Sequence, residues 1–142
     1  MINLVKKEIE KDVYSHETLS KFAIDVQNNR DELTWILKSI KRSGKRIAAV
    51  SAPAKGMTLL NYCGIGLETI DFVTEKAPEK IGKYTPGKHI PVSPDEELYN
   101  QMPDYALLLA WNFADEIMKN LDGYVKKGGK FIIPIPEPRI VG

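Results

Sequence analysis

The apolar positions in the first third of the chain predict one long amphipathic helix. From Ser15, a residue type suited to an N-cap, apolar side chains recur every three or four positions until Gly44. The stripe consists of Leu19, Phe22, Ala23, Val26, Leu33, Ile36, Leu37 and Ile40. A helix of about 28 residues is ~42 Å long, which is more than a small domain needs. We therefore expect its outer end to contact something else, and we interpret residues 1–14 as a lead-in, either a linker or an extra helix.

Beyond Gly44 the pattern changes to short apolar runs that alternate with helix-like segments. The runs that predict strands are 46–52, 68–75, 89–94, 104–111 and 130–136, and the helices between them are 54–64, 94–102 and 112–129. Such alternation is typical of βαβ units, in which a mainly parallel sheet is covered on both faces. Right-handed crossovers then favour an α/β, Rossmann-like three-layer sandwich of about five strands after the long helix. Residues 15–142 are expected to form this single domain.

Composition narrows the class of protein. The chain has 142 residues, which suits one domain, and its 20 basic and 19 acidic side chains give a net charge of +1. That balance does not indicate a nucleic-acid or membrane binder. The single cysteine, Cys63, excludes an internal disulfide and a cysteine-rich zinc site, and a buried structural thiol is expected. Without a signal-peptide pattern or an apolar run of about 20 residues, a cytoplasmic location is expected.

The turn "SAPAKGMT", which begins at Ser51, stands where α/β sheets place phosphates. It matches neither a P-loop nor a dinucleotide loop, because Lys55 precedes Gly56 and no earlier glycine is present. The free N–H groups at the start of a helix nevertheless attract anions, and Lys55 adds a full charge. Thr58 and Asn61, one turn later, could donate further hydrogen bonds. The alternative is a tight strand-to-helix turn with an exposed lysine.

The segment 80–94 is rich in glycine, proline and lysine and also contains Tyr84 and His89. Thr85 and Gly87 lie in a stretch with turn chemistry. A binding loop between core elements is one interpretation. In the other, the segment is a plain connection in which the tyrosine packs and the histidine caps a neighbouring group.

Trp111 and Asn112 end the most apolar predicted strand and begin a helix. Asn112 suits an N-cap, whereas the functional alternative is a pair of side chains that face a base or a sugar. The sequence contains no glycine-rich methyl-donor loop, no H-E-x-x-H, no G-x-S-x-G and no His/Cys cluster. We therefore predict no catalytic and no metal-ligating residue in this chain.

Four segments taken together resemble the C-terminal domain of S-adenosylmethionine-dependent C-methyltransferases, among them the sugar C-methyltransferases of deoxysugar biosynthesis. They are "APAKGMTLLNYCGI", "PEKIGKYTPGKHIPV", "PDYALLLAWNFADEI" and "GGKFIIPIP", and the resemblance runs from about residue 46 to 136. In that family a zinc-binding domain and a methyl-donor-binding domain precede a Rossmann-like domain that closes over a nucleotide-sugar. The resemblance implies that this chain is the last domain, either excised or as a separate subunit. S-adenosylmethionine would then serve the full enzyme without binding here, and the chain alone would be inactive.

The match to the family pattern can be followed residue by residue. The positions that fit are Ala52, Ala54, Lys55, Gly56, Thr58, Asn61, Thr85, Pro86, Gly87, His89, Ile90, Pro91, Trp111 and Asn112. Ser51 stands where glycine is usual, Met57 where asparagine is common, and Lys88 where threonine is common. The first two departures affect a close backbone approach and a polar contact, whereas the added charge of Lys88 could suit a diphosphate.

The first hypothesis is therefore a domain that binds the nucleotide-diphosphate sugar, or a related small acceptor, and helps to enclose the active site beside the methyl-donor-binding domain. Its candidate substrate-binding residues are Ser51, Lys55, Gly56, Thr58, Asn61, Tyr84, Thr85, Gly87, His89, Trp111 and Asn112. The second hypothesis is a non-catalytic interaction module that docks on partner domains. A third, a dinucleotide-binding oxidoreductase domain, is disfavoured by the missing glycine fingerprint.

Overall fold

The computed structural model describes residues 2–11 and 15–142. The chain begins with helix α1 (Ile2–Glu10), so this part of the lead-in is an extra helix, and residues 12–14 lie outside the described part. Helix α2 (His16–Arg42) follows. The hydroxyl of Ser15 accepts a hydrogen bond from the Thr18 N–H at 3.0 Å, which confirms the predicted N-cap.

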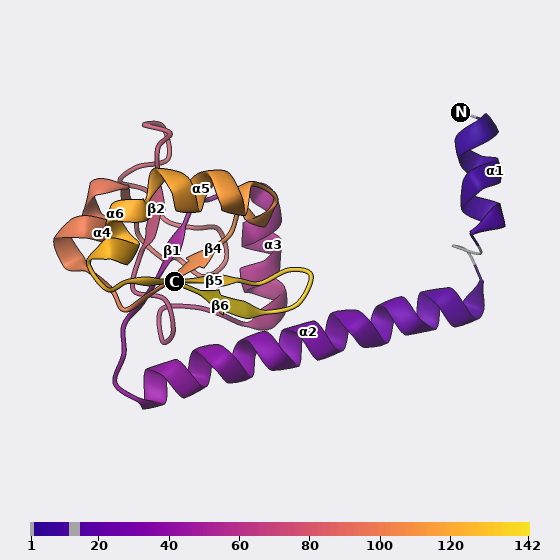
Figure 1. Ribbon diagram of the computed structural model, residues 1–142, viewed down its shortest axis with the longest axis horizontal. Coiled ribbons are helices and arrows are strands. Elements are labelled where there is room, and N and C mark those ends of the chain that lie inside the picture. Colours follow the sequence, from indigo (N-terminus) through magenta and orange to yellow (C-terminus); the bar gives the residue numbers. More distant parts are fainter. Residues whose placement is uncertain (1, 12–14) are drawn as a thin grey trace.

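Only the second half of α2 packs on the sheet. Leu33, Leu37 and Ile40 are buried, whereas Leu19 is 52% exposed and Phe22 is 67% exposed. In Figure 1, α2 runs past the sheet and α1 lies beyond its far end. The outer half, which is expected to contact something else, extends beyond the sheet because a 27-residue helix is about 40 Å long while a four-residue strand spans only about 13 Å.

The chain forms a mixed α/β structure around a six-stranded sheet of order β3-β2-β1-β4-β5-β6. The strands are β1 (Ile47–Val50), β2 (Val73–Glu75), β3 (Val92–Pro94), β4 (Tyr105–Leu108), β5 (Lys130–Ile133) and β6 (Arg139–Val141). The pairs among β1 to β5 are parallel, as expected, and β6 runs antiparallel to β5. The sixth strand was not predicted, because its three residues are largely exposed and show no buried apolar run.

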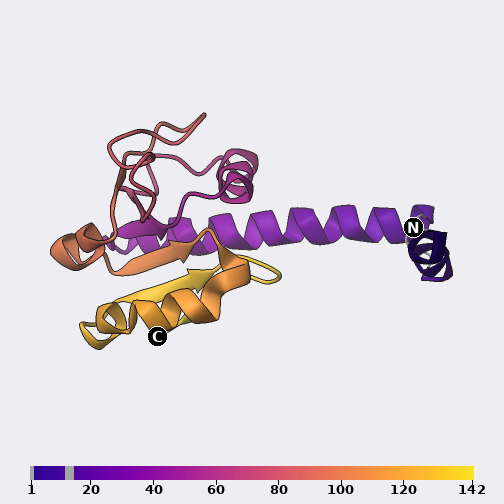
Figure 2. The same ribbon diagram turned by 90° about the horizontal axis from the view of Figure 1, so that it is seen from above.

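Both faces of the sheet are covered. The helices are α3 (Ala54–Cys63), α4 (Glu96–Gln101), the 3-10 turn η1 (Trp111–Phe113), α5 (Ala114–Asn120) and α6 (Asp122–Lys126). In β1, Ile47 and Ala49 join a buried cluster with α2 and α3, while Ala48 and Val50 join a second cluster with α4, α5 and α6. Figure 2 shows α5 and α6, in orange, on the opposite side of the sheet from α3.

All five predicted strands are shorter than expected, and one predicted helix is divided. The strand predicted at 68–75 is confined to β2, because the N–H groups of Thr69 and Ile70 donate to the Gly66 carbonyl in a tight turn. The helix predicted at 112–129 is divided into η1, α5 and α6, with a break at Leu121. Cys63 is half-buried beside the first cluster, and burial raises the pKa of its thiol.

Candidate functional site

The carboxyl ends of β1, β2 and β4 meet at one edge of the sheet, where α/β proteins bind ligands. We call this the carboxyl edge; it consists of the turn 51–53, the start of α3, the loop 76–91 and η1. All of the candidate residues from the sequence lie on these segments or on α3. The structure gives them several distinct roles.

The turn after β1 is tightly held. Ser51 has a φ of +71°, in the left-handed region that favours glycine, and its N–H donates to the Thr74 carbonyl at 2.8 Å. This conformation accounts for the glycine that is usual at position 51 in the family. Gly56 is required for a different reason: a Cβ there would lie 2.7 Å from the Cβ of Leu109. Its role in the structure is therefore to let α3 approach the chain just beyond the end of β4.

A carboxylate joins the turn to the next loop. One Glu75 oxygen accepts from the Ala52 N–H at 2.9 Å, and the other accepts from the N–H groups of Lys76 at 2.8 Å and Ala77 at 3.3 Å. Lys80 Nζ lies 3.6 Å away. Burial by itself would raise the pKa of Glu75, but these N–H groups and Lys80 together hold it below its usual value. The residue that would accept ribose hydroxyls in a dinucleotide site is therefore occupied by the protein's own backbone.

The loop around Tyr84 is a compact, internally bonded turn. Thr85 is buried; its N–H donates to the Ile90 carbonyl at 2.9 Å, and its Oγ1 accepts from the Ile90 N–H at 3.0 Å. His89 has a φ of +52° and donates its N–H to the Thr85 carbonyl. Tyr84 pairs with Pro91 through its backbone, while its side chain is 66% exposed. Thr85 and His89 therefore shape this loop.

Asn61 and Gly87 fix the loop against α3. Asn61 Nδ2 donates to the Pro86 carbonyl at 3.3 Å. Gly87 has a φ of +84°, and a Cβ added to it would overlap the amide group of Asn61. Their positions in the sequence are thus explained by helix–loop packing.

Lys55 lies over an aromatic ring. Its Nζ is 4.6 Å from the centre of the Trp111 ring, a cation–π contact, and it makes no hydrogen bond or ion pair within the described part of the chain. The two side chains line an open hollow of about 500 Å³ between α2 and α3, which we call the aromatic hollow. It is lined by Phe22, Val26, Lys55, Thr58, Leu59, Tyr62 and Trp111. The Thr58 hydroxyl is turned to the Ala54 carbonyl at 3.2 Å.

A second hollow, of about 350 Å³, lies on the other side of α3. We call it the lysine hollow; its lining residues are Ala52, Ala54, Met57, Lys80, Lys83, Tyr84, Thr85, Pro86 and Val92. Lys80 and Lys83 were not among the candidates from the sequence. Their signals were the abundance of lysine in the segment 80–94 and their place in a segment that resembles the family.

The candidate residues therefore share one edge of the sheet but not one hollow. Ser51 lines a small third hollow of about 90 Å³ towards α5. The side chains of His89 and Asn112 are exposed outside these hollows. The N-cap predicted for Asn112 is wrong, because neither η1 nor α5 has a side-chain cap and the turn begins one residue earlier, at Trp111.

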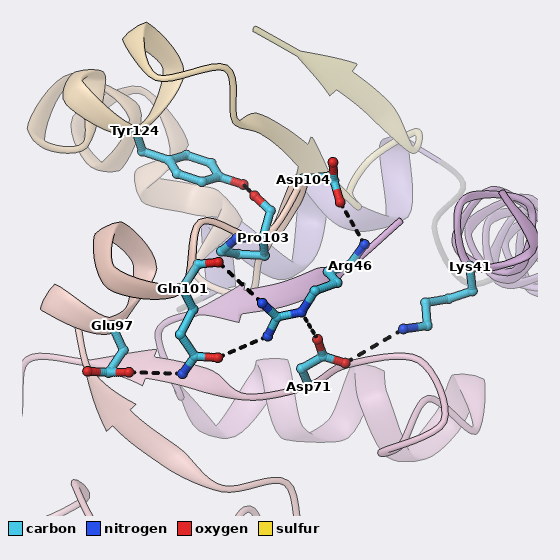
Figure 3. A network of polar contacts seen from close by, with 8 residues as sticks. All are labelled: Lys41, Arg46, Asp71, Glu97, Gln101, Pro103, Asp104 and Tyr124. Atoms are coloured by element: carbon cyan, nitrogen blue, oxygen red, sulfur yellow. Dashed lines mark hydrogen bonds and ion pairs between the residues drawn. The ribbon is translucent and has the colours of Figure 1, made fainter. Parts of the chain in front are cut away.

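The opposite edge of the sheet, at the amino ends of β1 and β4, carries a network of paired polar groups (Figure 3). Arg46 Nε donates to Asp71 at 2.8 Å, and the same guanidinium donates to the carbonyl and the side-chain oxygen of Gln101. The Arg46 N–H donates to Asp104 at 2.8 Å and holds the pKa of that carboxyl below its usual value. We call this the amino edge.

Tyr124 completes the amino edge from inside the core. Its ring is fully buried, and its hydroxyl donates to the Pro103 carbonyl at 2.7 Å (Figure 3). Burial, with a further contribution from the Asp104 charge, raises the pKa of the phenol far above its usual value. Tyr124 therefore remains a donor throughout the ordinary pH range.

Residues 2–11 and 15–142, the part of the chain that the structure describes, lack two other features. No group of three or more His, Cys, Asp or Glu side chains in it is placed to hold a metal ion. None of its helices combines the length and the apolar character needed to cross a membrane.

Comparison with known proteins agrees with the resemblance read from the sequence. The family model described as the C-methyltransferase C-terminal domain matches residues 1–136. C-methyltransferase NovU of Streptomyces niveus is 40% identical over 121 residues, which are 85% of this chain and 29% of that protein. The chain thus spans less than a third of the length of this relative.

Proposed function

Because the chain belongs to the C-methyltransferase C-terminal domain family, we propose that it is the acceptor-binding, active-site-closing domain of an S-adenosylmethionine-dependent C-methyltransferase. The acceptor is a nucleoside-diphosphate sugar or a related small molecule, such as an intermediate of deoxysugar biosynthesis. The strand order β3-β2-β1-β4-β5-β6 supports a Rossmann-like domain with a ligand beyond the carboxyl ends of its strands.

The observation that carries this proposal is the set of unengaged polar groups at the carboxyl edge. The Lys83 ammonium, the Tyr84 hydroxyl and the Asn112 amide form no hydrogen bond or ion pair with the residues that the structure describes, and the first two border the lysine hollow. Ammonium and hydroxyl groups around an apolar hollow match the chemistry of a phosphorylated sugar, which has both charged and ring portions.

The methyl donor does not fit this edge. The turn after β1 lacks the glycine-rich pattern that allows close approach of a dinucleotide or adenosine ligand. Both oxygens of Glu75 are already bonded to backbone N–H groups, so they are not available to a ribose. We therefore place the methyl donor on another part of the enzyme, and we expect this chain alone to transfer no methyl group.

That other part is the partner we propose for the projecting half of α2. Leu19 and Phe22 are each more than half exposed there, and the aromatic hollow, which Phe22 also lines, continues this apolar surface onto α3. Large exposed apolar patches mark interaction surfaces. A family relative more than three times as long as the matched segment has ample chain to cover this surface.

The experiment is a thermal-shift screen of the chain against nucleoside-diphosphate sugars, with S-adenosylmethionine measured by calorimetry. We expect at least one nucleotide-sugar to raise the melting temperature and S-adenosylmethionine not to bind. Tight binding of S-adenosylmethionine would contradict the assignment of the donor to another part of the enzyme.

A second function, an interaction module with no ligand of its own, is favoured by the same exposed surface on α2, together with Leu4, Val5 and Ile9 on α1. The screen separates the two functions. If no nucleotide shifts the melting temperature, the interaction module is favoured over the acceptor-binding domain.

A further inference from the structure

The lysine hollow differs from the aromatic hollow in the state of its cations. Lys55 in the aromatic hollow is held against the face of Trp111. In the lysine hollow, the Lys83 ammonium has no polar partner within residues 2–11 and 15–142. A cation without a partner beside a hollow is available to an anionic ligand.

The backbone places two lysines together on the wall of this hollow. The Lys83 N–H donates to the Lys80 carbonyl at 3.2 Å, so the two residues are one turn apart. Lys80 Nζ is positioned by the Ala52 carbonyl at 3.0 Å and lies 3.6 Å from Glu75. Glu75 offsets the charge of Lys80, and the charge of Lys83 is left over.

The remaining lining suits the uncharged portion of a nucleotide-sugar. Ala54, Met57 and Val92 supply an apolar floor, and Tyr84 presents an exposed ring with a free hydroxyl at the rim. Aromatic rings of this kind stack on bases, and a hydroxyl can bond a phosphate or a sugar oxygen. The volume of about 350 Å³ lies within the range of small-molecule pockets.

We propose that the lysine hollow binds the diphosphate of the acceptor, with Lys83 as the principal phosphate ligand and Lys80 beside it, in place of Lys55. This assignment rests on the proposed function, since it names the residues through which that function recognises its ligand. Lys55 lies on the other side of α3, in the aromatic hollow.

The test is isothermal titration calorimetry of the whole chain with inorganic pyrophosphate and with UDP, GDP, CDP, ADP and dTDP. Lys83→Ala is expected to weaken pyrophosphate and nucleoside diphosphate binding roughly tenfold or more, the range for loss of a hydrogen bond to a charged group. Lys83→Arg, which keeps the charge, should stay within a few-fold of the wild type. Lys80→Ala should also weaken binding, and its melting temperature shows whether loss of the Ala52 contact disturbs the loop.

Two control variants make the result specific. Lys76→Ala removes the same charge from the same loop but outside the lysine hollow, and Lys55→Ala removes the cation of the aromatic hollow. Both should retain wild-type affinity. An equal loss in Lys76→Ala would indicate a general charge effect and overturn the assignment.

The remaining outcomes separate this proposal from the proposed function. If nucleoside diphosphates bind and only Lys55→Ala weakens them, the acceptor-binding function stands and the lysine hollow is overturned as the phosphate site. If neither pyrophosphate nor any nucleoside diphosphate binds the wild-type chain, both proposals are overturned.

Discussion

The two edges of the sheet use polar side chains in opposite ways. At the amino edge, Arg46 bonds Asp71, Gln101 and Asp104, and the buried Tyr124 hydroxyl has its own acceptor (Figure 3). At the carboxyl edge, Glu75 and Lys80 are also paired, but Lys83, Tyr84 and Asn112 have no polar side-chain partner among the described residues. Within the described residues, the hydroxyl of Thr74 in β2 is a buried polar group with no hydrogen bond, one residue before Glu75.

This difference separates structural from functional polar groups. A polar network whose members are all paired contributes to rigidity and to a unique fold. Polar groups left unpaired beside a hollow add nothing to folding stability and remain available to a ligand. We therefore expect substitutions of polar side chains at the amino edge to change stability, and substitutions of the unpaired groups at the carboxyl edge to change binding.

The largest expected effect tests whether a residue at the carboxyl edge is structural after all. Gly56→Val places side-chain atoms against Leu109, where even a Cβ would be 2.7 Å from its neighbour. We expect a loss of about 3 kcal/mol in the free energy of unfolding, measured by urea denaturation. Ala54→Val, at an exposed position of the same helix, should cost only about 0.5 kcal/mol. Equal costs would show that α3 does not depend on its close contact with Leu109.

The next largest effect on stability is expected when two tyrosines, one at each edge, are compared. Tyr124→Phe removes the hydrogen bond to the Pro103 carbonyl and leaves that buried acceptor unpaired, at a cost of about 2 kcal/mol. Tyr84→Phe removes an exposed hydroxyl without a partner in the described part of the chain, and we expect no change in the melting temperature. A destabilised Tyr84→Phe variant would contradict the distinction between the edges.

Glu75 is a paired carboxylate at the carboxyl edge, so it should behave like the amino edge. Glu75→Gln is expected to cost about 1 kcal/mol at pH 7, because the neutral amide accepts hydrogen bonds less strongly and presents an NH₂ group to a backbone donor. The pKa of Glu75 is lowered by folding, so its contribution is complete above the usual value of 4.5 and is lost as the pH falls through the lowered folded pKa.

The deficit of the Glu75→Gln variant relative to the wild type should therefore shrink as the pH is taken from 7 to about 3. Urea denaturation of both proteins across this range measures it. A deficit that stays constant with pH would show that the charge of Glu75 does not stabilise the turn.

The smallest effect concerns the strained backbone after β1. Ser51→Gly relieves a φ of +71° but gives the unfolded chain more freedom, so we expect a net gain of about 0.5 kcal/mol. Ser43→Gly, at a φ of −79° and with loss of a hydroxyl bond to the Ile40 carbonyl, should have the opposite sign. Calorimetry should therefore show a higher melting temperature for Ser51→Gly and a lower one for Ser43→Gly than for the wild type.

Periodicity predicted the elements whose faces are buried, and it was less informative elsewhere. The inner half of α2 and the parallel strands carry apolar runs that pack in this chain, so their positions are confirmed. The outer half of α2 has the same spacing, but an apolar stripe does not reveal whether its partner lies within the chain. Strand β6 has no buried stripe and therefore left no signal.

The sequence predicted which edge of the sheet carries the candidate residues, but it did not predict which hollow each of them lines. Strand order alone brings the turn after β1, the loop 76–91 and η1 together. Whether Lys55 and Tyr84 face each other depends on the rotation of α3, and the structure places them on opposite sides of this helix. Lys83 lies in a segment that resembles the family but was not one of the matched positions, so its place beside a hollow identified it.

The most direct test of the contrast between the edges is a two-dimensional ¹H–¹⁵N NMR titration of the 142-residue chain with the same nucleoside diphosphates. We predict that the amide signals that move belong to the carboxyl edge, in residues 51–58, 76–91 and 110–113. The signals of residues 41–46 and 101–104 at the amino edge should stay in place. Shifts centred on the amino edge, or no shifts with any of the nucleotides, would contradict the assignment of the carboxyl edge as the ligand-binding side of this domain.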